Sequence, residues 1–123
     1  MNQTQLSEDE LEARRKRIRD LNDAVRRGEV TEPTRFTAVF TQGVNSRGME
    51  FVLAAADAVK RFDAFTPDND PYGERDFGAV EVSGEKVLWK IDLYDRSLRF
   101  GSPDPADPDV THRVLTIMLA SEY

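Results

Sequence analysis

The stretch Thr66–Gly101, TPDNDPYGERDFGAVEVSGEKVLWKIDLYDRSLRFG, decides the fold that the sequence predicts. It opens with a loop rich in carboxylates, prolines and glycine, and then continues into segments with the alternation typical of β-strands. Phe77–Val82 and Lys86–Tyr94 enclose Ser83-Gly84-Glu85, which indicates a β-hairpin. After the turn Asp95-Arg96-Ser97, the segment Leu98–Phe100 is expected to form a third strand.

The second strand of this hairpin should cover a core with one of its two faces. Its apolar side chains alternate with a more polar set: Val87, Trp89, Ile91 and Leu93 against Leu88, Lys90, Asp92 and Tyr94. Side chains that alternate along a strand point to opposite faces of the sheet. Trp89, the single tryptophan, is therefore predicted to be a core anchor rather than a ligand-stacking residue.

Towards the N-terminus, a strand and a helix precede this stretch. Arg35–Gln42, RFTAVFTQ, alternates and is rich in β-branched and aromatic residues, so it predicts a strand. Met49–Phe62 has apolar residues at helical spacing and predicts a helix that packs on the sheet. The connector Gly43–Gly48, GVNSRG, lacks the lysine and the glycine spacing of a phosphate-binding loop, so we interpret it as an ordinary turn.

Helices are predicted at both ends of the chain. Ser7–Arg27 begins with a Ser7/Glu10 capping box and ends before Gly28, which is typical of helix termini. Its thin apolar stripe predicts a helix on the outside of the domain, or one that pairs with a second copy in a homodimer. At the other end, Asp107-Pro108 resembles a helix start, so Pro108–Ser121 is predicted as a buried helix with His112 exposed in its first turn.

These elements predict one α+β domain over residues 1–123, in the order α-β-α-β-β-β-α. We expect a mainly antiparallel sheet of about four strands. The helices over Met49–Phe62 and Pro108–Ser121 should pack on one face, and the N-terminal helix should be peripheral. Residues 1–6 are expected to be disordered.

Composition excludes several classes of function. The 123 residues include no cysteine and one histidine, so thiolate chemistry and His-based metal clusters are excluded. A signal peptide and a membrane-spanning run are both lacking, which predicts a cytoplasmic protein without membrane attachment. The net charge of −6 lies almost entirely in residues 63–109, which carry twelve acids and five bases. Direct nucleic-acid binding is therefore not expected of the body of the protein.

The N-terminal helix is the exception to this acidic character. A cluster of five bases could bind nucleic acid or an acidic partner: Arg14, Arg15, Lys16, Arg17 and Arg19. Acids are interleaved with these bases at the spacings that allow ion pairs along a helix, which favours a solvated helix face instead. No aromatic residue accompanies the cluster. Both interpretations remain open.

The loop Phe65–Phe77 carries the strongest functional signal, and three interpretations compete for it. Its Asp68-Asn69-Asp70 start resembles a calcium loop, but Ala79 stands where an EF-hand needs a glutamate. The string Asp76-Phe77-Gly78 matches a kinase motif without the rest of a kinase. The first interpretation is therefore an irregular divalent-metal site, or a set of carboxylates that act as general acid and base. It remains an alternative.

The second interpretation is structural, with Asx side chains and prolines that hold a long loop in one shape. The third is a surface that binds a protein, since long irregular loops are often functional. We expect that surface to be acidic, with Tyr72 as an aromatic anchor. Its predicted residues are Asp68, Asp70, Tyr72, Glu74, Asp76, Asp92 and Asp95.

Four strings in the second half of the chain are distinctive: FTPDNDPYGERDFG, WKIDLYD, RFGSPDPADP and RVLTIMLASEY. With them the chain resembles a family of short bacterial proteins known only as domain of unknown function 3768. The resemblance covers roughly residues 15–123. It implies a setting on plasmids and other mobile elements of proteobacteria, and it brings no reaction, cofactor or assigned site.

The leading hypothesis is thus a non-enzymatic protein of a mobile element that binds a partner with a basic surface. Its most specific form is an inhibitor of host defence, of the anti-CRISPR or anti-restriction type, whose acids take the place of DNA phosphates. No cofactor, metal or catalytic residue is assigned. The alternatives are a divalent-metal-dependent enzyme that uses the same carboxylates, and a nucleic-acid regulator that acts through the N-terminal helix.

Overall fold

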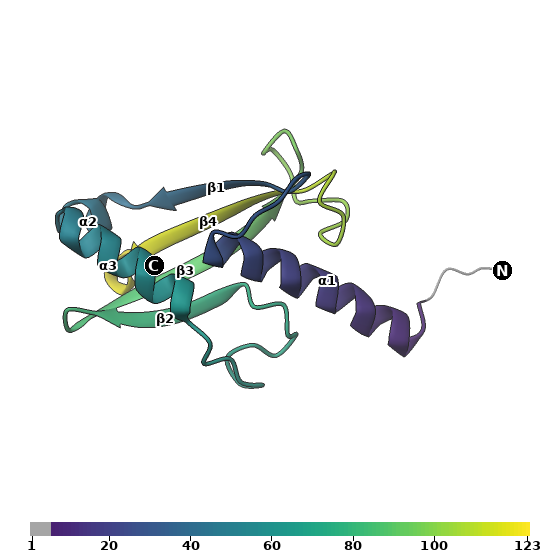
Figure 1. The fold of residues 1–123 in the computed structure, drawn as a ribbon, viewed down its shortest axis with the longest axis horizontal. Coiled ribbons are helices and arrows are strands. Elements are labelled where there is room, and N and C mark those ends of the chain that lie inside the picture. The colour runs from purple at the N-terminus through teal and green to yellow at the C-terminus, as the bar shows by residue number, and fades with distance from the viewer. Residues whose placement is uncertain (1–5) are drawn as a thin grey trace.

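A computed structural model describes residues 6–123, in which one four-stranded mixed sheet is combined with three α-helices (Figure 1). The strand order is β1-β4-β3-β2, with β1 parallel to β4 and the other pairs antiparallel. The predicted α+β class and mostly antiparallel sheet are confirmed. The elements are α1 (Glu8–Arg27), β1 (Arg35–Phe40), α2 (Gln42–Asn45), α3 (Met49–Arg61), β2 (Phe77–Val82), β3 (Glu85–Tyr94), β4 (His112–Leu119) and a final 3-10 turn (Ala120–Glu122).

The predicted C-terminal helix over Pro108–Ser121 is wrong, because this segment forms the central strand β4. Arg113, Leu115, Ile117 and Leu119 alternate along one buried face, as the two-residue period of a strand requires. Asp107 does not start a helix. Its carboxylate accepts a hydrogen bond from the amide of Asp109 at 2.9 Å, which is a local turn.

The predicted third strand of the meander is also wrong. The carboxylate of Asp95 accepts hydrogen bonds from the Ser97 hydroxyl at 2.8 Å and the Arg99 amide at 3.2 Å, so the chain turns here. Only an isolated bridge between Tyr94 and Gly101 follows. The hairpin before it is confirmed. Ser83 and Gly84 form its turn with φ angles of 52° and 79°, the paired positive values that match the twist of a hairpin.

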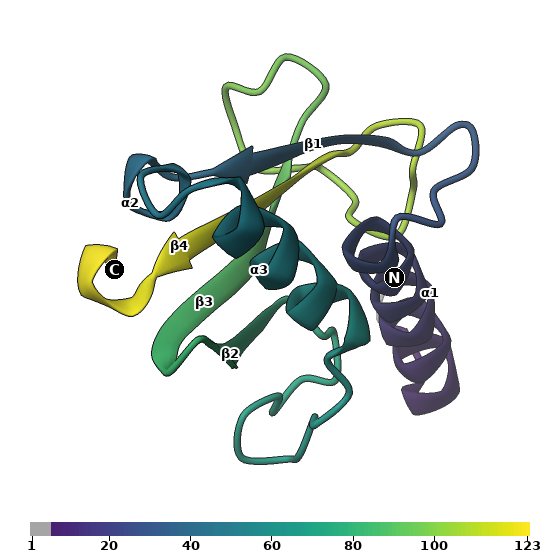
Figure 2. The ribbon, with the colours of Figure 1, turned by 60° about the vertical axis from the view of Figure 1, so that its left-hand side comes forward.

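Both long helices cover the same face of the sheet (Figure 2). Val25 of α1 and Ala55 and Val59 of α3 share one apolar cluster with strands β3 and β4. Trp89 lies in its middle with no exposed surface, so the prediction of a core anchor is confirmed. The helix predicted over Met49–Phe62 is confirmed as α3, one residue shorter at its end.

Helix α1 takes the place on the sheet that the prediction gave to a C-terminal helix. Its capping box at Ser7 and its left-handed Gly28 are confirmed. From Ile18 onward the helix is anchored in the body by buried residues, whereas its N-terminal half projects from the domain (Figure 1). The prediction of a peripheral helix is therefore right only for that half.

Residues 1–5, which belong to the segment expected to be disordered, lie outside the described residues, and Leu6 is exposed. Among residues 6–123, no helix has the length and apolar character needed to cross a membrane.

Candidate partner-binding surface

The connection from α3 to β2, residues 62–76, is fastened to α1, and we call it the acidic loop. The guanidinium of Arg19 donates to the carbonyl of Gly73 at 2.9 Å. The side-chain amide of Asn22 donates to the backbone carbonyl of Glu74 at 2.9 Å. In the other direction, Arg75 of the loop forms an ion pair with Asp23 of α1 at 3.0 Å. The helix therefore fixes the loop at three consecutive residues.

Side chains within the acidic loop stiffen it further. The side-chain Oδ1 of Asn69 accepts from the backbone amide of Thr66 at 2.8 Å, and the Thr66 hydroxyl accepts from the backbone amide of Asn69 at 3.2 Å. The carboxylate of Asp70 accepts from the Arg75 amide at 3.1 Å. Such bonds from Asx and Thr side chains hold a turn without regular secondary structure. They agree with the structural interpretation of this loop.

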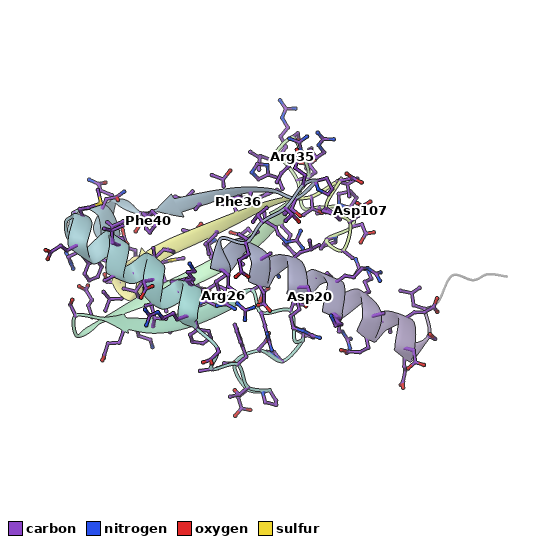
Figure 3. All side chains as sticks on the ribbon, viewed as in Figure 1. Asp20, Arg26, Arg35, Phe36, Phe40 and Asp107 are labelled. Carbon is purple, nitrogen blue, oxygen red and sulfur yellow. The ribbon has the colours of Figure 1, made fainter. Side chains whose placement is uncertain are left out.

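Arg26 joins the loop to the end of α3 (Figure 3). Its Nη1 lies 3.0 Å from the carbonyl of Val59, 3.2 Å from that of Lys60 and 2.7 Å from that of Phe62. A cation at the C-terminus of a helix satisfies free carbonyls and the helix dipole. Its guanidinium also lies 5.3 Å from the ring centre of Phe65, so the side chain sits between polar and aromatic partners.

A second buried arginine lies under α1. Arg113 has no exposed surface. Its Nε donates to the side-chain Oδ1 of Asn22 at 2.7 Å, and its Nη2 donates to the backbone carbonyl of Pro105 at 2.7 Å. Burial lowers the pKa of Arg113 to about 10, although the charge of Glu74 acts in the opposite direction. Asn22 thus bonds both the buried cation and the acidic loop.

An open cleft of about 450 Å³ separates α1 from the tip of the acidic loop. Arg15 and Arg19 lie on the helix side, and Asp70, Tyr72 and Arg75 lie on the loop side. Tyr72 is 72% exposed although its neighbours Gly73 and Glu74 are fixed to α1. An aromatic side chain on a fixed backbone is a suitable anchor for a partner, since little order has to be gained on binding.

Four of the predicted acids share one electrostatic neighbourhood. Burial and the charge of Asp76 raise the pKa of Glu74, although Arg14 and Arg15 act against this. Asp76 is more exposed, but partial burial of its carboxyl group and the charges of Asp70 and Asp92 raise its pKa as well. A basic partner would relieve this repulsion.

Asp68, Asp92 and Asp95 differ in their local contacts. Asp68 is exposed at the loop tip. Asp92 pairs with Lys90 on the sheet at 2.9 Å. The carboxylate of Asp95 accepts hydrogen bonds within its own turn, and those from Ser97 lower its pKa. Among residues 6–123, no three Asp, Glu or His side chains converge as ligands for a metal ion.

A family model described as "Protein of unknown function (DUF3768)" matches residues 40–122. The chain belongs to this family. The DUF3768 match runs from the last residue of β1 through β4, so it contains the acidic loop and leaves α1 outside. The family resemblance stated for the sequence is thereby confirmed over residues 40–122. Comparison with curated proteins and with solved structures gave no match.

In this DUF3768 chain the basic residues of α1 have different surroundings. Arg14 pairs with Asp104 at 3.1 Å, Lys16 with Asp20 at 2.6 Å, and Arg19 reaches Gly73. Arg15 and Arg17 are exposed and form no ion pair within residues 6–123. A nucleic-acid contact through this helix therefore stays a prediction that rests mainly on these two side chains.

Sequence reasoning missed the positioning residues of the surface. Asn22, Asp23, Arg26 and Arg75 are polar, and their types alone indicate a solvated helix or loop. The helical spacing contained a signal, since Asn22 and Arg26 continue the buried line of Ile18 and Val25. Polar residues within an apolar stripe predict buried hydrogen bonds, because unpaired polar groups in a core are costly.

Proposed function

We propose that this chain is a non-enzymatic interaction protein that binds a basic protein surface through the acidic loop. The observation that carries the proposal is a contrast within one segment. The backbone at Gly73 and Glu74 is bonded to α1, while Tyr72 and Asp68 beside it remain exposed. A rigid loop with an exposed aromatic residue and free carboxylates is suited to docking.

The electrostatics support a cationic partner. The pKa values of Glu74 and Asp76 are raised in the free protein. A lysine or arginine brought close to these carboxyl groups would stabilise their charged forms. Complementary charge of this kind speeds association and selects partners more than it adds affinity. The proposed surface is Asp68, Asp70, Tyr72, Glu74 and Asp76, with Asp92 beside it.

In its finer form, the proposal is an inhibitor of host defence, of the anti-CRISPR or anti-restriction type, that acts in the bacterial cytoplasm on behalf of a mobile element. The support for this form is the setting that the family resemblance implies, together with the acidic surface. Carboxylates on a fixed backbone could occupy a basic groove in which a nuclease normally holds DNA phosphates.

The test compares two double variants, each of which changes two exposed side chains. Asp68→Asn with Tyr72→Ala changes the proposed surface, whereas Glu29→Gln with Glu50→Gln removes exposed acids elsewhere. Each protein is used to capture binding proteins from a bacterial lysate at two salt concentrations. Wild type and the control pair should retain the same salt-sensitive protein, and the loop pair should lose it by tenfold or more.

The same three proteins are then expressed in cells with an active CRISPR or restriction system, and plasmid establishment is counted. Wild type and control should raise establishment, and the loop variant should not. Equal capture by all three proteins would contradict the proposed surface. Normal capture with no effect on plasmid establishment would contradict only the defence-inhibitor form.

A further inference from the structure

Strand β1 is an edge of the sheet with free backbone groups. It pairs with β4 on one side only, and its residues from Arg35 to Val39 are all exposed (Figure 1). The backbone amide of Thr41, directly after β1, donates to the carbonyl of Ile117 in β4. The odd-numbered residues of β1 therefore direct their amide and carbonyl groups towards β4. Because bonding directions alternate along a strand, Phe36, Ala38 and Phe40 point their amide and carbonyl groups away from β4.

The usual protections of an edge are absent from this strand. Natural edge strands carry charges, prolines or bulges that prevent pairing with another chain. Within RFTAVF the only charge is Arg35, at the start, and no residue is proline or glycine. The opposite edge, β2, contains Gly78 and Glu81. One outward carbonyl of β1, that of Phe40, is occupied by the Asn45 side chain at 3.1 Å.

A groove continues the edge on the helix side of the sheet. It has a volume of about 290 Å³, and Phe36, Ala38 and Phe40 form its β1 wall. Its floor and far wall come from α1, α3 and β4. They combine the apolar residues Val25, Ala56, Val59, Leu115 and Ile117 with the charged residues Arg26, Arg27 and Lys60. Phe36 is 43% exposed at its mouth (Figure 3). An additional strand beside β1 would cover this phenylalanine.

We infer that the occupant of this edge is a second copy of the chain, paired antiparallel through β1 about a two-fold axis at Ala38. The sequence Phe36-Thr37-Ala38-Val39-Phe40 is nearly symmetric about its centre: aromatic, β-branched, alanine, β-branched, aromatic. An isologous interface requires a surface that is complementary to itself. In this register Phe36 faces Phe40 of the second copy, and Thr37 faces Val39.

The backbone satisfies the same register. Ala38 of each copy donates to and accepts from Ala38 of the other, and Phe36 pairs with Phe40 of the other copy in the same way. The Phe40 carbonyl, which already accepts from Asn45, would accept this bond with its second lone pair. Aromatic and β-branched side chains are favourable cross-strand neighbours. Arg35 lies opposite Thr41, so the arginines of the two β1 strands do not face each other. The two-fold axis runs perpendicular to the sheet, which brings the two grooves together on one face of an eight-stranded sheet.

The first test is the mass in solution, measured by light scattering over a range of protein concentrations. Wild type should form a species of twice the 14.0 kDa chain mass. Ala38→Lys places two like charges at the axis, and Ala38→Pro removes the outward amide, so both should weaken dimerisation tenfold or more. Val39→Lys is the matched control, because it adds the same charge opposite Thr37 and should retain the dimer.

The second test does not depend on the stability of those variants. The chain has no cysteine, so a single introduced thiol reports proximity between copies. Under mild oxidation, Ala38→Cys should cross-link rapidly, because paired Cα atoms in an antiparallel sheet are about 5.5 Å apart, within disulfide reach. Leu11→Cys, on the projecting half of α1, should cross-link at most at the rate of random collision.

A monomeric wild type at every concentration would overturn the inference. Rapid cross-linking at Leu11 instead of Ala38 would overturn it in favour of a dimer through α1. Monomeric wild type that binds a foreign extended peptide, with loss of binding in Ala38→Pro, would assign the edge to a different partner and would also overturn it. None of these results bears on the acidic loop, which leads into β2 at the opposite edge of the sheet.

Discussion

Gly78 lies against the indole of Trp89. A Cβ atom at this position would come within 2.5 Å of the indole nitrogen and 2.8 Å of two ring carbons. Since the indole is buried among Phe62 and Phe65, it has little room to move. Gly78→Ala should therefore lower the free energy of unfolding by about 1–3 kcal/mol, as overpacked cores do. Urea unfolding followed by Trp89 fluorescence measures this loss.

Gly101→Ala is the matched control for that variant. No heavy atom lies within 4 Å of a Cβ built at Gly101. Its effect on the free energy of unfolding should stay within about 0.5 kcal/mol, as for ordinary surface substitutions. Equal effects of the two substitutions would mean that the indole does not pack on Gly78.

Asn22 is a second residue with a large expected effect. Asn22→Ala leaves Nε of the buried Arg113 without its acceptor and the carbonyl of Glu74 without its donor. Loss of a partner by a buried charge is costly, so the free energy of unfolding should fall by about 2–4 kcal/mol. Asn45→Ala, which removes one exposed hydrogen bond, should cost about 1 kcal/mol or less. Thermal and urea unfolding of both variants measure whether the loss in free energy of unfolding is larger at the buried Asn22 than at the exposed Asn45.

The raised pKa of Glu74 predicts a pH dependence of stability. Its cause is first burial and then the charge of Asp76. Because the folded protein binds this proton more tightly than the unfolded chain does, the folded state loses stability as pH rises from the ordinary pKa through the raised one. Glu74→Gln should therefore be more stable than wild type at neutral pH, and this advantage should disappear below the ordinary pKa of 4.5.

Urea unfolding at several pH values measures the difference in stability between Glu74→Gln and wild type. The pH values should run from about 4 to 7.5, because this range brackets the titration of perturbed carboxyl groups. Glu81→Gln on the edge strand β2, which also replaces one glutamate by glutamine, is the control for the change of residue type. A Glu74→Gln variant with the same slope as wild type would show that the pKa of Glu74 is not raised in the folded protein.

At the scale of elements, local patterns could predict α1, α3 and the β2–β3 hairpin, because caps, helical spacing and turn residues all agree there. At β4 the local pattern predicted a helix instead of the strand that forms. Leu115, Met118 and Leu119 suit a helix, and Asp107-Pro108 resembles its start, but Val114, Thr116 and Ile117 are β-branched. Pairing with both β1 and β3 decides in favour of a strand, and such long-range pairing is not visible in local sequence.

The contact between α1 and the acidic loop was equally hidden from the sequence. Arg19 and Gly73 are 54 residues apart, and nothing in their local patterns joins them. The acids and bases of the two segments suggested separate surfaces, whereas the fold places them on the two sides of one cleft. Sequence could therefore nominate the acidic loop, but not the helix that holds it.

This contact predicts the behaviour of the loop when α1 is altered. Arg19→Gln removes the charged donor to Gly73, so amide hydrogens of residues 66–76 should exchange faster with solvent, with a loss of about 1–2 kcal/mol in their local protection. Arg17→Gln removes an exposed base from the same helix and should leave the loop unchanged. Hydrogen exchange followed by mass spectrometry separates the two results, and equal exchange in both variants would contradict a loop fixed by Arg19.

At the scale of the whole molecule, the two proposed surfaces lie in different parts of the fold. The acidic loop follows the C-terminus of α3 and faces α1, whereas β1 is the far edge of the sheet from β2 (Figure 2). A dimer through β1 would leave both copies of the acidic loop accessible. Two identical loops on one assembly would increase the apparent affinity for a partner that offers two basic sites.

The whole molecule also determines which part of the chain can fold alone. The family match begins at residue 40, yet α1 supplies Ile18, Val25, Asn22 and Arg26 to the buried interior. Burial of an isoleucine or valine side chain contributes about 1.5–3 kcal/mol each, and the total stability of a domain is about 5–15 kcal/mol. Without α1 and β1, Arg113 also loses its acceptor on Asn22.

A fragment of residues 40–123 should therefore lack a cooperative thermal transition, with Trp89 fluorescence shifted towards that of a solvated indole. The full chain should unfold in one transition, because helix and sheet share one core. Addition of a peptide of residues 6–39 in trans should restore the buried fluorescence of Trp89, and the same peptide with Asn22→Ala should restore less. If the fragment alone melts cooperatively with a buried tryptophan, α1 is an accessory to the fold, and its arginines are free for another role.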